Sequence, residues 1–169
     1  MKISITGHTR GIGLAIKNYF ENQGHEVIGF SRETGYDLQH PSIREKVVSL
    51  SKDSDIFVNN AYGYGGEFQF SLLKRIYKSW EGKNKTIINI STRFTGGDDI
   101  YSARKKTMDE FCETNIYHLP NIINIKPGLV DTDRVKAIND PKMSTDDVVK
   151  ILDWILHQPI KIHSITFGK

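Results

Sequence analysis

Short apolar runs alternate with amphipathic segments along the whole of this 169-residue sequence. Several of the runs are apolar toward both sides, which is typical of parallel strands that are covered on both faces. The amphipathic segments repeat their apolar residues at helical spacing. This order predicts an α/β fold, a single-domain doubly wound parallel sheet of the Rossmann type over residues 1–169, with helices on both faces.

Turn and cap residues set the expected boundaries of these elements. Strands are predicted at residues 3–6, 26–31, 37–38, 55–59, 86–90, 121–125 and 160–167. Helices are predicted at residues 12–23, 41–50, 70–80, 101–116 and 144–157. Pro41 stands at the start of its helix, where proline is tolerated, and Ser144 with Asp147 three residues on predicts a cap for the last helix.

Composition excludes several classes of protein. The net charge of +3, without a dense basic block, argues against nucleic acid as a partner. No apolar run approaches the roughly 20 residues of a membrane span, so no membrane partner is expected. The single cysteine, Cys112, excludes an internal disulfide and a multi-cysteine zinc site, and the scattered histidines predict no metal. The N-terminus does not resemble a signal peptide, and we expect a cytoplasmic protein.

The first predicted strand runs into a glycine-rich loop, Thr6–Gly13, that opens the first predicted helix. Gly7 permits a tight turn, Gly11 lets a pyrophosphate approach the backbone, and Gly13 lets the helix pack close to the strand. The free N–H groups and positive dipole end of the helix favour phosphates there. The predicted cradle comprises Gly7, Thr9, Arg10, Gly11, Ile12 and Gly13. A plain strand–helix turn is the alternative, and the Gly-Lys-Ser/Thr signature of a kinase loop is missing.

This loop and four later motifs resemble the landmarks of the short-chain dehydrogenase/reductase family, in the family's order. The later motifs are Asn59-Asn60-Ala61, Ser91-Thr92, Tyr101-Ser102-Ala103-Arg104-Lys105 and Pro127-Gly128-Leu129-Val130-Asp131-Thr132. Together they span nearly the whole chain. The resemblance implies an enzyme, an NAD(P)-dependent oxidoreductase that moves a hydride between nicotinamide and a carbonyl or alcohol group of a small-molecule substrate.

The end of the second predicted strand bears on the choice of cofactor. It lacks the carboxylate that would bond the adenine ribose 2′-hydroxyl of NAD, and carries Ser31 and Arg32 instead. Arg10 could approach a 2′-phosphate from the glycine loop, and guanidinium groups bind phosphates bidentately. This pattern resembles that of NADP(H)-preferring members and favours NADP(H) over NAD(H), with two surface arginines as the alternative. Asp37-Leu38 resembles the pair that lines the adenine pocket, with a simple turn as the alternative.

Two further strand ends resemble cofactor contacts of the family. One would run alongside the cofactor and brace the sheet, and comprises Asn59, Asn60 and Ala61. The other would contact the nicotinamide carboxamide and the phosphates, and comprises Pro127, Gly128, Val130 and Thr132. Ordinary strand-ending turns are the alternative in both places. Tyr62 replaces the family's common glycine, and the glycines at 63, 65 and 66 predict a mobile loop.

Tyr101 and Lys105 are four residues apart on a predicted helix and therefore share a face. An ammonium group near a phenol favours the phenolate and so lowers the phenol pKa from about 10 toward neutrality. Tyr101 would exchange a proton with the substrate oxygen, and the resemblance implies that Lys105 also holds the nicotinamide ribose hydroxyls. The family's oxygen-binding hydroxyl corresponds better to Thr92, with Ser91 as the alternative.

The active-site region departs from the family pattern. Tyr101 lies only nine positions after Thr92, several fewer than usual, and the stretch from Asn60 to Thr92 has room for one helix instead of two. The family's further catalytic asparagine has no clear counterpart, although Gln69 or Ser71 could lie nearby. These departures favour the main alternative, a non-catalytic NADP(H)-binding sensor or interaction module, whereas the Tyr101/Lys105 pair argues against it.

The segment of residues 133–142 stands where the family carries a substrate lid. It is brief and charged, so it would cover little of a substrate, and a small or polar substrate is expected. An isomerase or epimerase is a third alternative, although longer relatives of that kind carry an extra substrate region. The family's homo-oligomers pair the helix that carries Tyr101, and the shortened region before it would reduce that interface.

Overall fold

The computed structural model describes residues 1–63 and 67–169. In that part of the chain six strands form one parallel sheet in the order β2-β1-β3-β4-β5-β6. The strands are β1 (Lys2–Thr6), β2 (Glu26–Phe30), β3 (Ile56–Asn59), β4 (Thr86–Ile90), β5 (Asn121–Pro127) and β6 (Ser164–Phe167). From β1 the chain adds strands first toward one edge and then, from β3, toward the other. This confirms the predicted doubly wound sheet; in proteins with such sheets, ligands bind at the strand ends where the winding reverses.

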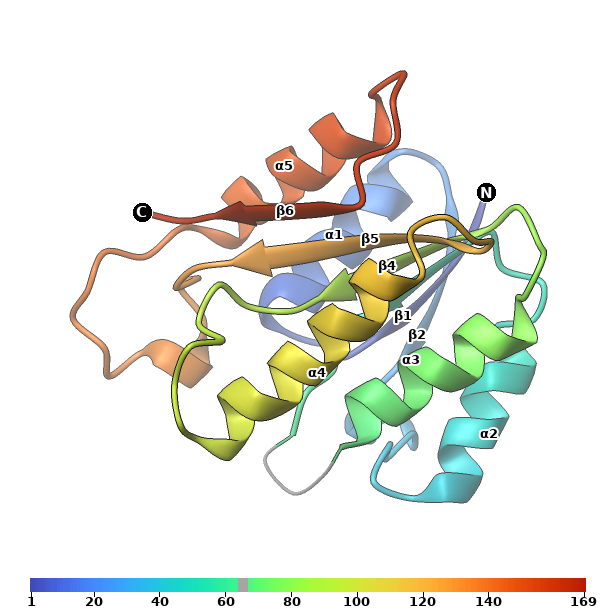
Figure 1. The fold of residues 1–169 in the computed structure, drawn as a ribbon, viewed down its shortest axis with the longest axis horizontal. Coiled ribbons are helices and arrows are strands. Elements are labelled where there is room, and N and C mark those ends of the chain that lie inside the picture. The colour runs from blue at the N-terminus through green and yellow to red at the C-terminus, as the bar shows by residue number, and fades with distance from the viewer. Residues whose placement is uncertain (64–66) are drawn as a thin grey trace.

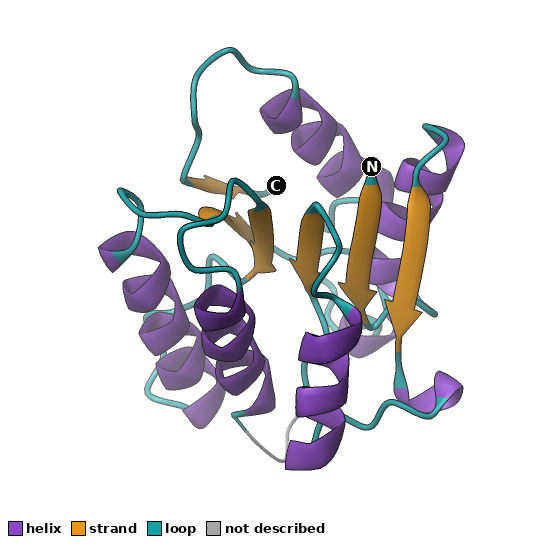
Figure 2. Cartoon of the chain, turned by 90° about the vertical axis from the view of Figure 1, so that its right-hand side faces the viewer, coloured by secondary structure: helices purple, strands orange, loops and turns teal. Residues whose placement is uncertain are grey.

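Helices cover both faces of the sheet. They are α1 (Gly11–Asn22), α2 (Pro41–Leu50), α3 (Phe68–Ser79), α4 (Ile100–Thr114) and α5 (Thr145–Leu156). Two short 3₁₀ turns span Arg32–Thr34 and Asp133–Val135. The helices α2, α3 and α4 lie on one face, and α1 and α5 lie on the other (Figure 1). Figure 2 shows the sheet between these two layers.

Each face of the sheet has its own apolar core because successive strand residues point to opposite faces. In β3, Phe57 packs into the cluster under α2, α3 and α4, together with the fully buried Trp80 at the end of α3. Its neighbour Val58 packs into the cluster under α1 and α5, which also contains Phe20 and Leu152. The strands therefore read as continuous apolar runs, as a sheet buried on both sides requires.

The predicted strand at residues 37–38 is wrong. Gly35 takes a left-handed conformation with φ of 85°, and the chain then turns, with Asp37 Oδ1 accepting a hydrogen bond from the Gln39 N–H at 3.0 Å. This turn leads directly into α2, so the segment has no length over which to pair with a strand. Leu38 is buried in the core beneath α2, α3 and α4.

The other boundaries differ by a few residues. Strand β6 begins at Ser164 instead of residue 160, because residues 160–163 form a loop before the pairing with β5 starts. Helix α3 begins at Phe68, two residues before the expected start. The predicted cap of α5 is confirmed: the Asp147 N–H donates to Ser144 Oγ, and the Ser144 N–H donates back to Asp147 Oδ2.

None of the described helices has the length and apolar content that crossing a membrane requires. The expectation of a mobile loop after β3 falls largely on Gly65 and Gly66, which lie outside the described residues.

Candidate active site

The glycine loop between β1 and α1 contains two left-handed residues, Gly7 with φ of 69° and Gly11 with φ of 54°. Glycine adopts such angles without steric cost. Gly13 must lack a side chain for another reason, since a Cβ there would lie 2.0 Å from Gly7 O and 2.5 Å from Asn60 Nδ2. The first turn of α1 therefore sits directly on the loop, and its N–H groups point out at the carboxyl end of β1.

The end of β3 is tied to this loop through Thr6 and Asn60. The Asn60 amide Nδ2 donates to Thr6 O at 3.0 Å and to Gly7 O at 3.2 Å. The backbone N–H groups of Asn60 and Ala61 both donate to Thr6 Oγ1 at 3.0 Å. The segment that was expected to brace the sheet thus connects two neighbouring strand ends.

The segment after β5 reaches the same edge of the sheet. A Cβ placed on Gly11 would lie 3.2 Å from Thr132 Cγ2, so Thr132 borders the glycine loop. Val130 is buried beside Met143, with Ile12 of α1 packed against the same small cluster. The structure brings Thr132 to the predicted cradle, whereas Val130 and Ile12 contribute apolar packing beneath it.

Two arginines mark the predicted 2′-phosphate site. Arg10 and Arg32 are exposed just after the carboxyl ends of the neighbouring strands β1 and β2, and Thr9 is half-buried beside Arg10. Ser31 is buried and bonded within its own turn: the Thr34 N–H donates to Ser31 Oγ at 3.2 Å, and the Ser31 N–H donates to Thr34 Oγ1 at 3.1 Å. The Ser31 hydroxyl therefore serves the turn, and Arg10 and Arg32 are the exposed basic residues next to it at these strand ends.

Tyr101 and Lys105 lie in the first two turns of α4, close to Tyr62. The rings of Tyr101 and Tyr62 pack edge to face, with centroids 4.9 Å apart and an interplanar angle of 87°. Lys105 Nζ lies 5.7 Å from the Tyr101 centroid and 5.2 Å from the Tyr62 centroid. Arg134, from the segment after β5, lies 4.7 Å from the Tyr62 centroid. Tyr62 therefore joins the predicted acid–base pair to the segment expected to form a lid.

The Lys105 side chain is only 4% exposed. Its ammonium donates to Gln69 Oε1 and to Ile90 O, both at 2.9 Å, and Ile90 is the last residue of β4. Burial lowers the pKa of Lys105 to about 7, opposed by the Asp109 carboxylate and assisted by the Arg134 guanidinium. Near neutral pH this residue can therefore both carry a charge and exchange a proton.

Both candidate hydroxyls after β4 are buried. Thr92 Oγ1 accepts a hydrogen bond from the Phe94 N–H at 3.2 Å, within its own turn. Ser91 Oγ makes no hydrogen bond to any described residue. Buried hydroxyls in native structures are normally hydrogen-bonded, so Ser91 Oγ is as well suited as Thr92 Oγ1 to donate a hydrogen bond to the oxygen of a ligand.

The short connection from Thr92 to Tyr101 is fastened to the start of α4. Asp99 caps the helix by accepting the Ser102 N–H at Oδ1, 3.0 Å away. The Ser102 hydroxyl lies 2.8 Å from Asp99 Oδ2 and 3.3 Å from Phe94 O, close to both acceptors. The cap fixes where α4 begins, and with it the position of Tyr101.

An arginine covers the strand end that is expected to face the nicotinamide carboxamide. Pro127 is buried at the end of β5, and a Cβ on Gly128 would lie 2.9 Å from Arg93 Nε. Two hydrogen bonds hold Arg93 there. Its backbone N–H donates to Pro127 O at 2.9 Å, and its side-chain Nη2 donates to Lys169 O at 3.1 Å. A ligand at this strand end would contact the Arg93 side chain.

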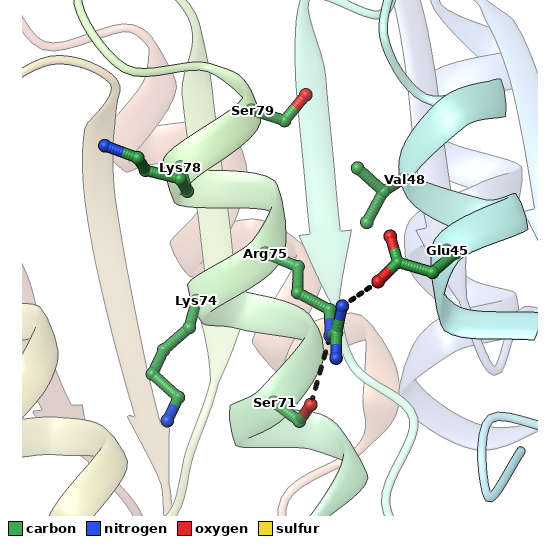
Figure 3. Close-up of a pocket in the computed structure, with 7 residues that line it drawn as sticks. All are labelled: Glu45, Val48, Ser71, Lys74, Arg75, Lys78 and Ser79. Carbon is green, nitrogen blue, oxygen red and sulfur yellow. Dashed lines mark hydrogen bonds and ion pairs between the residues drawn. The ribbon is translucent and has the colours of Figure 1, made fainter. Parts of the chain in front are cut away.

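Two hollows lie near or beside the site. A small cavity next to Lys105 is lined by Tyr62, Glu67, Gln69, Phe70, Arg104, Lys105 and Met108. A surface groove between α2 and α3 is lined by Glu45, Val48, Ser71, Lys74, Arg75, Lys78 and Ser79 (Figure 3). In the groove Arg75 bonds to Glu45 and Ser71, and none of the predicted catalytic or cofactor-binding residues lines it. Within residues 1–63 and 67–169 no cluster of His, Cys, Asp or Glu could hold a metal ion.

No protein-family model and no curated protein matches this sequence. Solved structures do match its fold. A short-chain dehydrogenase from Burkholderia cenocepacia J2315 in complex with NADP has a TM-score of 0.80 at 15% identity, over 99% of this chain and 88% of that chain. A 3-alpha-hydroxysteroid dehydrogenase from Pseudomonas sp. B-0831 complexed with NADH has a TM-score of 0.77 at 18% identity, over 99% and 95%. This chain has the short-chain dehydrogenase/reductase fold.

Within the short-chain dehydrogenase/reductase fold, three contacts did not follow from the sequence patterns. Of the two residues that could lie near the site, Gln69 contacts Lys105 directly, a contact that the sequence did not specify, whereas Ser71 faces the groove and bonds to Arg75. Tyr62 stands out in sequence only as a departure from glycine, which did not indicate that its ring would meet Tyr101. Arg134 lies in a charged segment without any local motif. All three contacts join residues far apart in the chain, so no local signal could have found them.

Proposed function

We propose that this chain is an NADP(H)-dependent oxidoreductase, one NAD(P)-binding domain over residues 1–169 that interconverts a carbonyl and an alcohol on a small polar substrate. The observation that carries the proposal is the buried Lys105 ammonium beside Tyr101, held by neutral acceptors. A buried cation is costly for a fold, so its presence beside a phenol at the ligand-binding edge favours a catalytic role.

The residues at this edge suit a nicotinamide dinucleotide. Gly7 and Gly13 have no room for a side chain because neighbouring protein atoms lie there, so the loop packs tightly, and the start of α1 offers N–H groups to a pyrophosphate. Arg10 and Arg32 would hold the 2′-phosphate, and Lys105 would hold the nicotinamide ribose. Structures with the same fold contain NADP or NADH, which supports this class of cofactor.

The chain's own residues divide the remaining work. When bound, the cofactor supplies or accepts the hydride at the substrate carbon. In the reducing direction the Tyr101 hydroxyl gives its proton to the carbonyl oxygen, and in the oxidising direction the phenolate takes the proton from the alcohol. The charge of Lys105 favours the phenolate. Thr92 or Ser91 donates a hydrogen bond that orients the substrate oxygen.

A second function, NADP(H) binding without turnover, is favoured by two specific contacts. The Tyr62 ring lies against Tyr101, where the substrate would bind, and Arg93 lies over Gly128, where the nicotinamide would bind. Side chains therefore occupy both positions. A sensor or interaction module would need only the glycine loop and the arginines. Turnover separates the two functions.

Binding and turnover by wild-type and Tyr101→Phe protein test the proposal. Thermal shifts with NADPH, NADP⁺, NADH and NAD⁺ establish binding, since a ligand at a hundredfold its Kd stabilises by about 2.7 kcal/mol. Oxidation of NADPH with small polar aldehydes and ketones then measures turnover. We expect Tyr101→Phe to lose about a hundredfold or more in kcat with cofactor affinity unchanged.

The exposed Tyr117 provides the matched control, because Tyr117→Phe removes the same hydroxyl far from the site. Equal turnover by Tyr101→Phe and wild-type protein would reject Tyr101 as the proton donor. Dinucleotide binding without turnover of any carbonyl in the panel would favour the sensor, and no binding of any dinucleotide would reject both functions.

A further inference from the structure

Three asparagines stand side by side in the middle of the sheet. Asn59 of β3 pairs in register with Asn89 of β4, and Asn89 pairs with Asn124 of β5. All three are fully buried. Asn59 Nδ2 donates to Asn89 Oδ1 at 2.9 Å, and Asn89 Nδ2 donates to Asn124 Oδ1 at 2.8 Å. We call Asn59, Asn89 and Asn124 the asparagine ladder; within it each amide donates toward the next, and Asn59 Nδ2 also donates to Gln69 O at 3.2 Å.

The asparagine ladder ends on a carboxylate. Asn124 Nδ2 donates to Asp109 Oδ1 at 2.8 Å, and Asp109 is only 6% exposed in the middle of α4. A carboxylate oxygen accepts hydrogen bonds, and each amide of the ladder presents an N–H donor toward this end. The ladder therefore fixes the position of the Asp109 carboxyl group under α4.

Asp109 lies one helical turn beyond Lys105, so the two buried side chains share a face of α4. The hydrogen bonds of the Lys105 ammonium go to uncharged acceptors, Gln69 Oε1 and Ile90 O. Attraction to Asp109 raises the pKa of Lys105 against the lowering effect of burial. The charge of Lys105 is thus balanced across one turn of helix and not by a direct ion pair.

Other charged or titratable groups surround Lys105. The positive charge of Arg134, which follows β5, repels the Lys105 ammonium and lowers the pKa of Lys105. Tyr62 and Tyr101 present their rings to the ammonium. Glu67 at the start of α3 and Arg104 of α4 line the same small cavity, and Glu67 is exposed to solvent. Asp109 is the carboxylate in this set that solvent does not screen.

We propose that Asp109, held by the asparagine ladder, is a positioning residue that acts as the fixed counter-charge of Lys105. Its consequence for catalysis rests on the proposed function. With the Asp109 carboxylate beside it, Lys105 stays largely cationic up to about pH 7, where it donates to the ribose hydroxyls and favours the Tyr101 phenolate. Without that charge Lys105 becomes neutral at lower pH and loses both actions as pH rises.

The test reads Lys105 directly in the cofactor-free protein. Lysine labelled with ¹³C at Cε is followed by NMR from pH 5 to 10, and Lys105→Met identifies the Lys105 signal by its loss. Asp109→Asn keeps an oxygen for Asn124 and removes only the charge. We expect the midpoint of Lys105 to fall by about one pH unit, the equivalent of a tenfold change in proton affinity.

Two variants serve as controls. Glu110→Gln removes a carboxylate from the neighbouring exposed position of α4 and should leave the Lys105 midpoint unchanged. Asp109→Glu keeps the charge and should restore a midpoint close to that of wild type. Circular dichroism measures whether each variant is folded. If Asp109→Asn does not fold, Asp109→Ser replaces it as the variant with a neutral side chain. A wild-type midpoint in a folded neutral variant would overturn the proposal.

NADPH affinity from pH 6 to 8 gives the functional readout. Relative to wild type, Asp109→Asn should bind about twofold more weakly at pH 6 and approach a tenfold loss at pH 8, following the fraction of protonated Lys105. A loss that is the same at every pH would indicate a merely structural role and contradict the proposal. If wild-type protein binds no dinucleotide while the Lys105 midpoint responds to Asp109, the proposed function fails and the counter-charge stands.

Discussion

Lys105 couples the stability of the fold to pH. Burial lowers its folded-state pKa to about 7, whereas a lysine in an unfolded chain titrates near about 10.4. Below pH 7 both states carry the ammonium, and the cost of burying it is fully present. Between these values the unfolded chain binds the extra proton, so the free energy of unfolding rises with pH, by up to about 1.4 kcal/mol per pH unit.

Lys105→Met should remove this dependence. Urea unfolding at pH 6, 7, 8.5 and 10 gives the free energy of unfolding of both proteins. The free energy of unfolding of wild type should rise between pH 7 and pH 10 by about 2–4 kcal/mol more than that of the variant, because only wild type contains the buried lysine. Lys106→Met is the control, since Lys106 is exposed on the next position of the same helix. Parallel pH curves for Lys105→Met and wild type would show that Lys105 is not buried as a titrating group.

At the scale of elements, one hydrogen bond joins the two helices that cover the second face of the sheet. Tyr19 Oη of α1 donates to Asp153 Oδ1 of α5 at 2.5 Å. Burial and this carboxylate raise the pKa of Tyr19 to about 12. The folded state therefore prefers the neutral phenol, and the stabilisation is fully present below about pH 10 and is lost as pH rises toward 12.

Tyr19→Phe should lower the free energy of unfolding by about 1 kcal/mol at pH 7, the usual net value of such a bond. Urea unfolding measures this change, and ultraviolet titration should show the loss of one tyrosine with a midpoint near 12. Tyr117→Phe, at a site 88% exposed, should leave stability unchanged. Equal stability of Tyr19→Phe and wild type would mean that packing alone joins α1 to α5.

The elements themselves were largely predictable because their signals are local. Strand β4 lies where the apolar run Thr86–Ile90 predicts it, and the cap at Ser144 begins α5 as expected. The strand at 37–38 failed because two residues carry too little pattern to outweigh a turn. The site was less predictable from the sequence, since Gln69 contacts Lys105 only because α3 packs beside α4. The functions of the named site residues stay predictions until they are measured.

For the whole molecule, the parallel sheet gathers distant positive charges at one edge. Arg10 follows β1 and Arg32 follows β2, and the pairing of these two strands puts both guanidinium groups at the same end of the sheet. The start of α1 adds the positive end of its dipole at that edge. A 2′-phosphate would therefore meet two arginines in addition to the field of the helix, whereas the hydroxyl of NAD would not need them.

Replacing both arginines by alanine should accordingly change selectivity and not binding in general. We expect the double variant to bind NADPH at least tenfold more weakly, with the loss reduced at high salt because these charges are exposed. NADH affinity should stay within about twofold, since its adenine ribose carries no phosphate to lose. Isothermal titration with both cofactors at 50 and 500 mM salt measures this, with Lys52→Ala, exposed before β3 at the opposite edge, as the control. An equal loss for NADPH and NADH would mean that the arginines hold the shared pyrophosphate, and NADP(H) preference would then need another source.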